Sequence, residues 1–174
     1  MSESKLPEVW LRGPLPGINP LLQPIAHALL QAKDEVNKLM IDFPDKLLWE
    51  QPAGVVSPAF HLQHFSGVLD RLFTYAKGQS LSPEQLQALK EEGVKKDGIT
   101  ADALIKRFNQ QIELSIEQLK NTEEKTLNDF RGVGRAQLPS TVLGLLTHSA
   151  EHTMRHFGQL LVTVRILKAG NLNL

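Results

Sequence analysis

Apolar residues recur every three or four positions in four segments of the chain, which is the spacing expected for one face of an α-helix. The segments cover residues 19 or 22 to 41, 58 to 77, 101 to 121, and 140 or 141 to 168. The alternation of apolar and polar residues that is typical of a strand does not occur in the sequence. The pattern therefore predicts an all-α protein built as a four-helix bundle.

Capping and helix-breaking residues mark the ends of these segments. A Ser-Pro pair at residues 57–58 is typical of a helix N-terminus. A second Ser-Pro pair at residues 82–83, with Gln85 in the capping-box position and Gly93 as the terminator, predicts a short extra helix. This helix falls between the second and third long helices. The segment 125–140 contains two glycines and a proline, and it is interpreted as a loop.

The first residues of the chain differ in character from the rest. Residues 1–19 contain three prolines and two glycines, and they predict an irregular arm that lies on the domain. Residues 20–170 are then expected to form one four-helix-bundle domain. A chain of 174 residues is long enough for one such domain with a full hydrophobic core.

Charge and composition argue against several kinds of binding partner and functional site. Nineteen basic residues balance nineteen acidic ones, so neither a nucleic acid nor a membrane surface is expected as a partner. The absence of cysteine excludes disulfides, zinc–thiolate sites and cysteine nucleophiles. The N-terminus lacks the pattern of a secretory signal, and no apolar run approaches the roughly 18 residues of a membrane span. A cytoplasmic location is therefore expected.

Five of the six histidines fall in the second and fourth predicted long helices. His148, His152 and His156 follow one another at intervals of four residues, and His61 and His64 lie on the other helix. Residues four apart are neighbours on a helix surface. Burying an unpartnered polar ring costs about 1–3 kcal/mol, and a bound divalent metal or a shared polar cavity would remove that cost. The spacing therefore indicates a metal site, with hydrogen-bonded core histidines as the alternative.

The pair His152 and His156 does not form the helix of a zinc metalloprotease. In that motif a glutamate directly follows the first histidine and acts as the general base. Here Glu151 precedes His152 and threonine follows it. The usual general base of such a protease is thus absent.

Two stretches of the sequence, "SPAFHLQHFSGVLDRLFTYAKGQSLS" and "LPSTVLGLLTHSAEHTMRHFGQLL", resemble the DinB/YfiT-like superfamily of metalloenzymes. The resemblance extends from about residue 24 to residue 168. It implies an up-down-down-up four-helix bundle and a homodimer. It also implies a divalent metal held by one histidine of the second helix and an H-x-x-x-H pair of the last.

On that resemblance, the ligands of this chain are His64, His152 and His156. His61 and His148 are then residues that surround the ligands, although an alternative ligand set of His61, His148 and His152 is also compatible with the helix geometry. Many relatives have an arginine directly after the last histidine, where this chain has phenylalanine. A role for that arginine is therefore not transferred to this chain.

Three imidazole ligands leave coordination positions open, as in catalytic metal sites. Nitrogen ligands favour Zn or Ni, with Fe, Cu or Mn as alternatives, over Mg or Ca. The resemblance implies a thiol-dependent transferase or a related enzyme or hydrolase that acts on a small molecule with a low-molecular-weight thiol. Glu151 and Asp70 are candidate acid/base groups, and a solvated surface carboxylate is the alternative for each. The second hypothesis for the whole chain is a non-catalytic, dimer-forming, stress-associated metal-binding module.

Overall fold

Helices account for most of the described chain, which comprises residues 6–171 of the computed structural model. Its five α-helices are α1 (Gln23–Leu39), α2 (Pro58–Ala76), α3 (Pro83–Glu91), α4 (Ala101–Lys120) and α5 (Val142–Asn171). Its two strands are β1 (Phe130–Val133) and β2 (Leu138–Thr141). The mainly helical fold and the short extra helix α3 agree with the pattern of apolar residues and caps.

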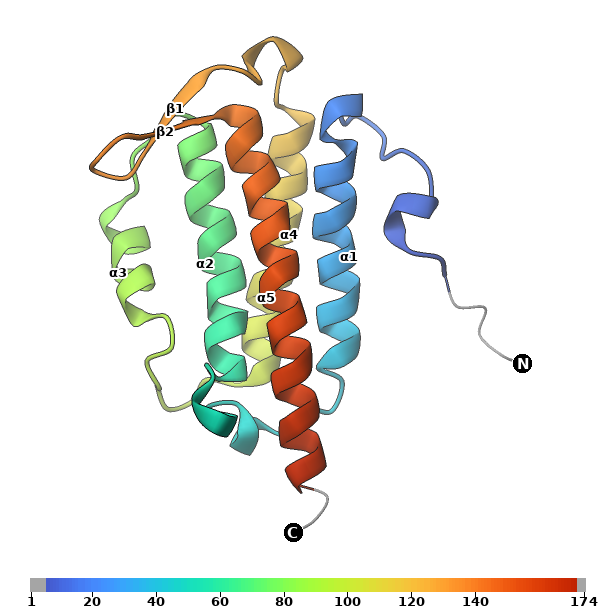
Figure 1. The fold of residues 1–174 in the computed structure, drawn as a ribbon, viewed down its shortest axis with the longest axis vertical. Coiled ribbons are helices and arrows are strands. Elements are labelled where there is room, and N and C mark those ends of the chain that lie inside the picture. Colours follow the sequence, from blue (N-terminus) through green and yellow to red (C-terminus); the bar gives the residue numbers. More distant parts are fainter. Residues whose placement is uncertain (1–5, 172–174) are drawn as a thin grey trace.

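The four long helices lie side by side around a common core (Figure 1). α2 packs against α4 and α5, and α1 packs against the same two helices. In the view of Figure 1, α1 and α5 run downward, whereas α2 and α4 run upward. α3 lies on the outside, against α2. This arrangement places α2 and α5, the two helices that carry five histidines, in direct contact.

The ends of the helices follow from local hydrogen bonds that the capping residues make. The hydroxyl of Ser57 accepts a hydrogen bond from the backbone N–H of Phe60 at the start of α2. At the start of α3, Ser82 and Gln85 each accept a hydrogen bond from the other's backbone N–H. Thr100 caps α4 in the same way as Ser57 caps α2. These short-range contacts explain why the helix boundaries can be predicted within a few residues.

The core is built by the inward faces of the long helices. Phe65 of α2 and Phe108 of α4 are fully buried, and their ring centroids are 5.0 Å apart. Leucines and isoleucines at helical spacing belong to the same core. The fully buried ones include Leu22, Leu29, Leu62, Leu69, Ile112, Leu119, Leu146 and Leu160. Tight packing of these side chains fixes how α2 and α5 meet.

The interpretation of residues 125–140 as a loop is wrong for part of the segment. β1 and β2 form an antiparallel hairpin that leads directly into α5, and Pro139 lies opposite Gly132. A proline is tolerated here because each strand of a two-stranded sheet has a neighbour on one side only. The residues of both strands are exposed or only partly buried, so neither face of the hairpin needs apolar side chains. The hairpin therefore lacks the alternation by which a strand is recognised in a sequence.

The described part of the N-terminal arm has an irregular backbone with short 3-10 turns. One such turn covers Val9–Leu11, and a second, Pro20–Leu22, directly follows the arm and precedes α1. The side chain of Gln23 bonds both the N–H and the C=O of Leu15, which ties the arm to α1. Residues 1–5 of the predicted arm lie outside the described residues. Among residues 6–171, no helix has the length and apolarity needed to cross a membrane.

Candidate metal centre

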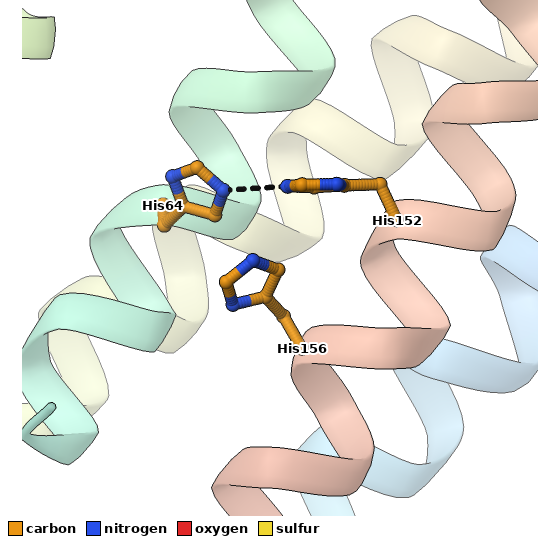
Figure 2. A group of neighbouring side chains, drawn as sticks. All are labelled: His64, His152 and His156. Carbon is orange, nitrogen blue, oxygen red and sulfur yellow. Dashed lines mark hydrogen bonds between the residues drawn. The ribbon is translucent and has the colours of Figure 1, made fainter. Parts of the chain in front are cut away.

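The clustered histidines come from two helices that pack together. His61 and His64 lie on α2, and His148, His152 and His156 lie on successive turns of α5. Figure 2 shows that His64 points from α2 toward His152 and His156. Because α2 and α5 pack along their lengths, these side chains meet in the seam between the two helices.

His64, His152 and His156 are close enough to share one ion. One ring nitrogen of each lies within 4.8 Å of the other two, and all three residues are partly buried. The Nε2 atoms of His64 and His152 are 2.9 Å apart (Figure 2). Two nitrogens on one tetrahedral zinc ion lie about 3.3 Å apart, given Zn–N distances of about 2.0–2.1 Å. The separations in this group therefore fit a single divalent metal.

A buried carboxylate orients the ring of His64. Glu92 Oε2 lies 2.7 Å from His64 Nδ1, and Glu92 Oε1 accepts a hydrogen bond of 2.5 Å from Arg71 Nη1. Burial alone would raise the pKa of Glu92, but the hydrogen bonds from His64 and Arg71 outweigh it and lower that pKa. An ionised Glu92 accepts a hydrogen bond from Nδ1–H of His64, and the Nε2 atom that faces the group then carries the free lone pair. Metal-binding histidines in proteins commonly have such a carboxylate partner.

The backbone around Glu92 is shaped to bring this carboxylate against α2. Gly93 adopts a φ of +81°, and its N–H donates a hydrogen bond of 2.7 Å to the Gln63 side chain of α2. A Cβ on Gly67 of α2 would lie 2.2 Å from Glu92 Oε1 and 2.7 Å from Arg71 Nη1. Gly67 therefore leaves the space that the ion pair of Glu92 and Arg71 occupies.

Sequence reasoning missed Glu92 and Arg71. Glu92 follows α3, 28 residues after His64, and no regular spacing connects the two residues. The neighbouring Gly93 indicates only the end of a helix. The sequence predicts the short extra helix, but it gives no sign that the end of this helix lies against His64.

His61 lies behind His156 and orients it. The His61 side chain is almost completely buried, and its Nδ1 lies 3.1 Å from Nδ1 of His156. This contact leaves Nε2 of His156 free to face the group. Burial, followed by the charge of His64, lowers the pKa of His61 to about 4. The pKa of His156 is also lowered to about 4. Burial is the largest cause, and the neighbouring histidines His64, His152 and His61 contribute less.

Burial lowers the pKa of His152 as well, with His64 as the next cause. His152 and His156 are therefore neutral near pH 7. A histidine must be neutral to bind a metal. The local environment thus keeps these two rings in the form that a metal ion requires.

The remaining predicted site residues lie farther toward solvent or apart from the group. His148 Nδ1 is 3.4 Å from Glu151 Oε2, and both side chains are about half exposed, at 50% and 48%. Arg155 pairs with Glu151, and this hydrogen bond is the main cause that lowers the pKa of the carboxyl. In residues 6–171, Asp70 belongs to neither of the two groups of potential metal ligands.

The alternative ligand set does not come together in the structure. His148 shares a potential ligand group with Glu151 and His152, whereas His61 belongs to neither potential ligand group of the described residues. His61 instead contacts His156. The three histidines that lie close together, His64, His152 and His156, are the ones that the resemblance implies as ligands.

Comparisons with known proteins agree with the helical fold. The chain matches the DinB superfamily over residues 7–160. It is also similar to the crystal structure of a protein from Streptococcus pneumoniae, a structural-genomics target, with a TM-score of 0.62 and 14% identity. That similarity covers 87% of this chain and 91% of the other, and at this identity it supports the fold alone. The chain has no significant match among curated proteins.

Proposed function

The chain belongs to the DinB superfamily, and on that premise we propose that it is a metal-dependent enzyme whose divalent metal is held by His64, His152 and His156. The convergence of one ring nitrogen from each of these residues within 4.8 Å carries the proposal. We further propose the up-down-down-up bundle, the homodimer and the cytoplasmic location that the superfamily resemblance implies. The helix directions in Figure 1 support the first of these.

The donor set suits a borderline metal such as Zn or Ni, with Fe, Cu or Mn as alternatives. All three proposed ligands are imidazoles, which such metals accept more readily than Mg or Ca does. Glu92 and His61 each occupy the second nitrogen of one proposed ligand. The remaining Nε2 atoms of His64 and His156 are therefore directed at one place. Preorganised ligands of this kind favour binding, because little side-chain entropy is lost when the ion enters.

Three protein ligands and partial exposure support a catalytic site rather than a closed structural one. A divalent metal at this position would lower the pKa of a water or a thiol in its open coordination position. The residues of the chain would hold that metal and shape its surroundings. The ring of Phe60 stacks on that of His64, with centroids 5.3 Å apart and planes 9° from parallel, and shields one face of His64 from water. Glu151, at the exposed rim, is the candidate group for moving a proton.

The proposed substrate is a small molecule, and the proposed reaction is a transfer that depends on a low-molecular-weight thiol. This part of the proposal rests on the resemblance to the superfamily. The half-exposed side chains of His148 and Glu151 next to the group support it, because a thiol and a second small reactant need access from solvent.

The first test is the metal content of untagged protein purified without added metal, measured by plasma mass spectrometry. We expect about one metal ion per chain. The variants His64→Ala, His152→Ala and His156→Ala should each lose it while circular dichroism shows that they remain helical. His27→Ala is the matched control, because His27 lies on α1, belongs to neither group of potential metal ligands within residues 6–171, and contacts the Gly13 carbonyl through its Nε2. Equal retention of metal in all four variants would disprove the ligand assignment.

The enzyme proposal has its own test. Metal-loaded protein is mixed with glutathione, mycothiol or bacillithiol and a chromogenic electrophile, and product formation is compared with that of the His64→Ala variant. A rate that depends on both metal and thiol supports the transferase. Metal binding without turnover for any thiol would instead favour the non-catalytic metal-binding module.

A further inference from the structure

A second group of potential metal ligands lies next to the first. His148, Glu151 and His152 also place one ligand atom each within 4.8 Å of one another. His148 and Glu151 are about half exposed, whereas the His64 side chain is only 14% exposed. The second group is therefore more exposed to solvent than the group formed by His64, His152 and His156.

His152 belongs to both groups. Its ring centroid is 5.1 Å from that of His148 on one side and 5.1 Å from that of His64 on the other. The three rings thus form a continuous series from the exposed surface of α5 to the partly buried seam with α2. An ion bound at the outer group could exchange His148 and Glu151 for His64 and His156 without leaving His152.

The two groups differ in charge. We call His148, Glu151 and His152 the outer group and His64, His152 and His156 the inner group; the outer group suits capture of a cation and the inner group suits its retention. Glu151 places a carboxylate within the outer group. The inner group consists of imidazoles, and its nearby carboxylate, Glu92, is already bonded to His64 and Arg71. A partly exposed carboxylate attracts divalent cations from solution and raises their association rate. The inner imidazoles then provide the ligands that a borderline metal prefers.

We propose that His148, Glu151 and His152 form an outer cation site that captures the divalent ion and passes it to His64, His152 and His156. This inference rests on the proposed function, since it requires that the inner group bind the metal. The outer site lowers the barrier for entry and for release alike. It therefore changes the rates of metal binding and leaves the final affinity unchanged.

Stopped-flow absorption of Co²⁺ uptake by metal-free protein tests this proposal. His148→Ala and Glu151→Gln should each slow uptake roughly tenfold and slow release to a chelator by the same factor. Both variants should still bind one Co²⁺ per chain, with the spectrum and Kd of the wild type. His27→Ala is again the control and should load at the wild-type rate. Both outer residues are exposed, so the variants are expected to fold normally.

Arg155 provides a variant with an effect of the opposite sign. Its guanidinium pairs with Glu151 and competes with an arriving cation for the carboxylate. Arg155→Gln should therefore accelerate uptake, but not when it is combined with Glu151→Gln. Equal acceleration in both backgrounds would mean that Arg155 acts only through its general charge, and it would contradict capture by Glu151.

The outcomes separate this inference from the proposed function. Wild-type rates in His148→Ala and Glu151→Gln, with normal Co²⁺ binding, would overturn the outer site and leave the inner site intact. A changed Kd or spectrum would also overturn it, because it would make these residues part of the final site. Absence of Co²⁺ binding by the wild type would overturn the inner site and the inference together.

Discussion

Glu92 determines which nitrogen of His64 faces the candidate metal site. Its carboxylate accepts a hydrogen bond from Nδ1–H of His64 and another from Arg71, which keeps the carboxylate in place. His61 makes the equivalent contact to Nδ1 of His156. At the scale of single residues, the site therefore consists of three candidate ligands and of the partners that fix their orientation.

Replacing Glu92 should weaken metal binding more than it weakens the fold. We expect Glu92→Gln to reduce affinity for zinc or cobalt roughly 10- to 100-fold, the usual effect of losing the carboxylate partner of a ligand histidine. Competition with a chromogenic chelator measures this change. Glu91→Gln is the matched control, because the neighbouring Glu91 is partly buried like Glu92 but pairs with Lys96 and Gln87 instead. Equal affinities for the two variants would contradict the role of Glu92.

The buried histidines should make the metal-free protein sensitive to mild acid. The pKa of His61 is about 4 in the folded protein because of burial and then of His64, compared with about 6.5 in an unfolded chain. Between these values the unfolded state binds more protons, so the free energy of unfolding falls as the pH decreases from about 6.5 toward 4. The lowered pKa of His156 acts in the same direction.

Urea unfolding in the presence of a chelator tests this expectation at pH 7, 6 and 5, where carboxylates of ordinary pKa remain mostly ionised. Stability should decrease steadily across the series. A His61→Phe variant should show a shallower decrease, because one of the buried titrating groups is then gone. A stability that is constant from pH 7 to pH 5 would contradict the assigned protonation states.

At the scale of elements, the segment that follows α3 lies against α2, and this contact brings Glu92 to His64. Gly67 has no side chain, and the ends of Glu92 and Arg71 occupy the space where its Cβ would lie. α3 itself is short and amphipathic, and a capping box fixes its start. The segment that follows the extra helix thus brings a carboxylate to the ring nitrogen of His64 that does not face His152.

Gly67→Ala should separate metal affinity from stability. The atoms that a new Cβ would meet are the ends of flexible side chains, so the fold can adapt while the ion pair moves away from His64. We expect metal affinity to fall roughly tenfold, because the carboxylate partner of His64 is displaced. Chelator competition measures the affinity, and thermal melting measures the stability.

Gly158→Ala on α5 is the matched control for this change. Nothing lies within 4 Å of a Cβ at Gly158, so the substitution should raise helix stability and leave metal affinity unchanged. Loss of affinity in both glycine variants would mean that the effect does not come from the ion pair of Glu92 and Arg71.

At the scale of the whole molecule, one ion would join α2 to α5 and thereby stabilise the packed helices. A ligand bound only by the native state at 100 times its Kd adds about 2.7 kcal/mol to the free energy of unfolding. For a protein of this size that corresponds to a shift in Tm of about 5–10 °C. Excess chelator should therefore lower the Tm of metal-loaded wild-type protein by this amount. The His64→Ala variant should melt at the same temperature with and without chelator.

The sequence by itself determined the features that depend on residues close together in the chain. Helical periodicity and capping residues specify four long helices and the short α3, because the hydrogen bonds involved span only three or four residues. The interval of four residues likewise aligns His148, His152 and His156 on α5. The resemblance indicated that His64, on a different helix, belongs to the same site as His152 and His156. In the structure His64 lies next to His152.

Only the tertiary structure decided which side chains surround these histidines. The contacts of Glu92 with His64 and of His61 with His156 join residues 28 and 95 positions apart. Such pairs form because helices dock through their apolar faces and α3 packs against α2, and neither event leaves a regular spacing in the sequence. The exposed hairpin escaped prediction for a related reason. Its strands pair through backbone hydrogen bonds, which do not depend on the pattern of side chains. Because neither face of the hairpin is buried, apolar and polar residues do not alternate along the strands.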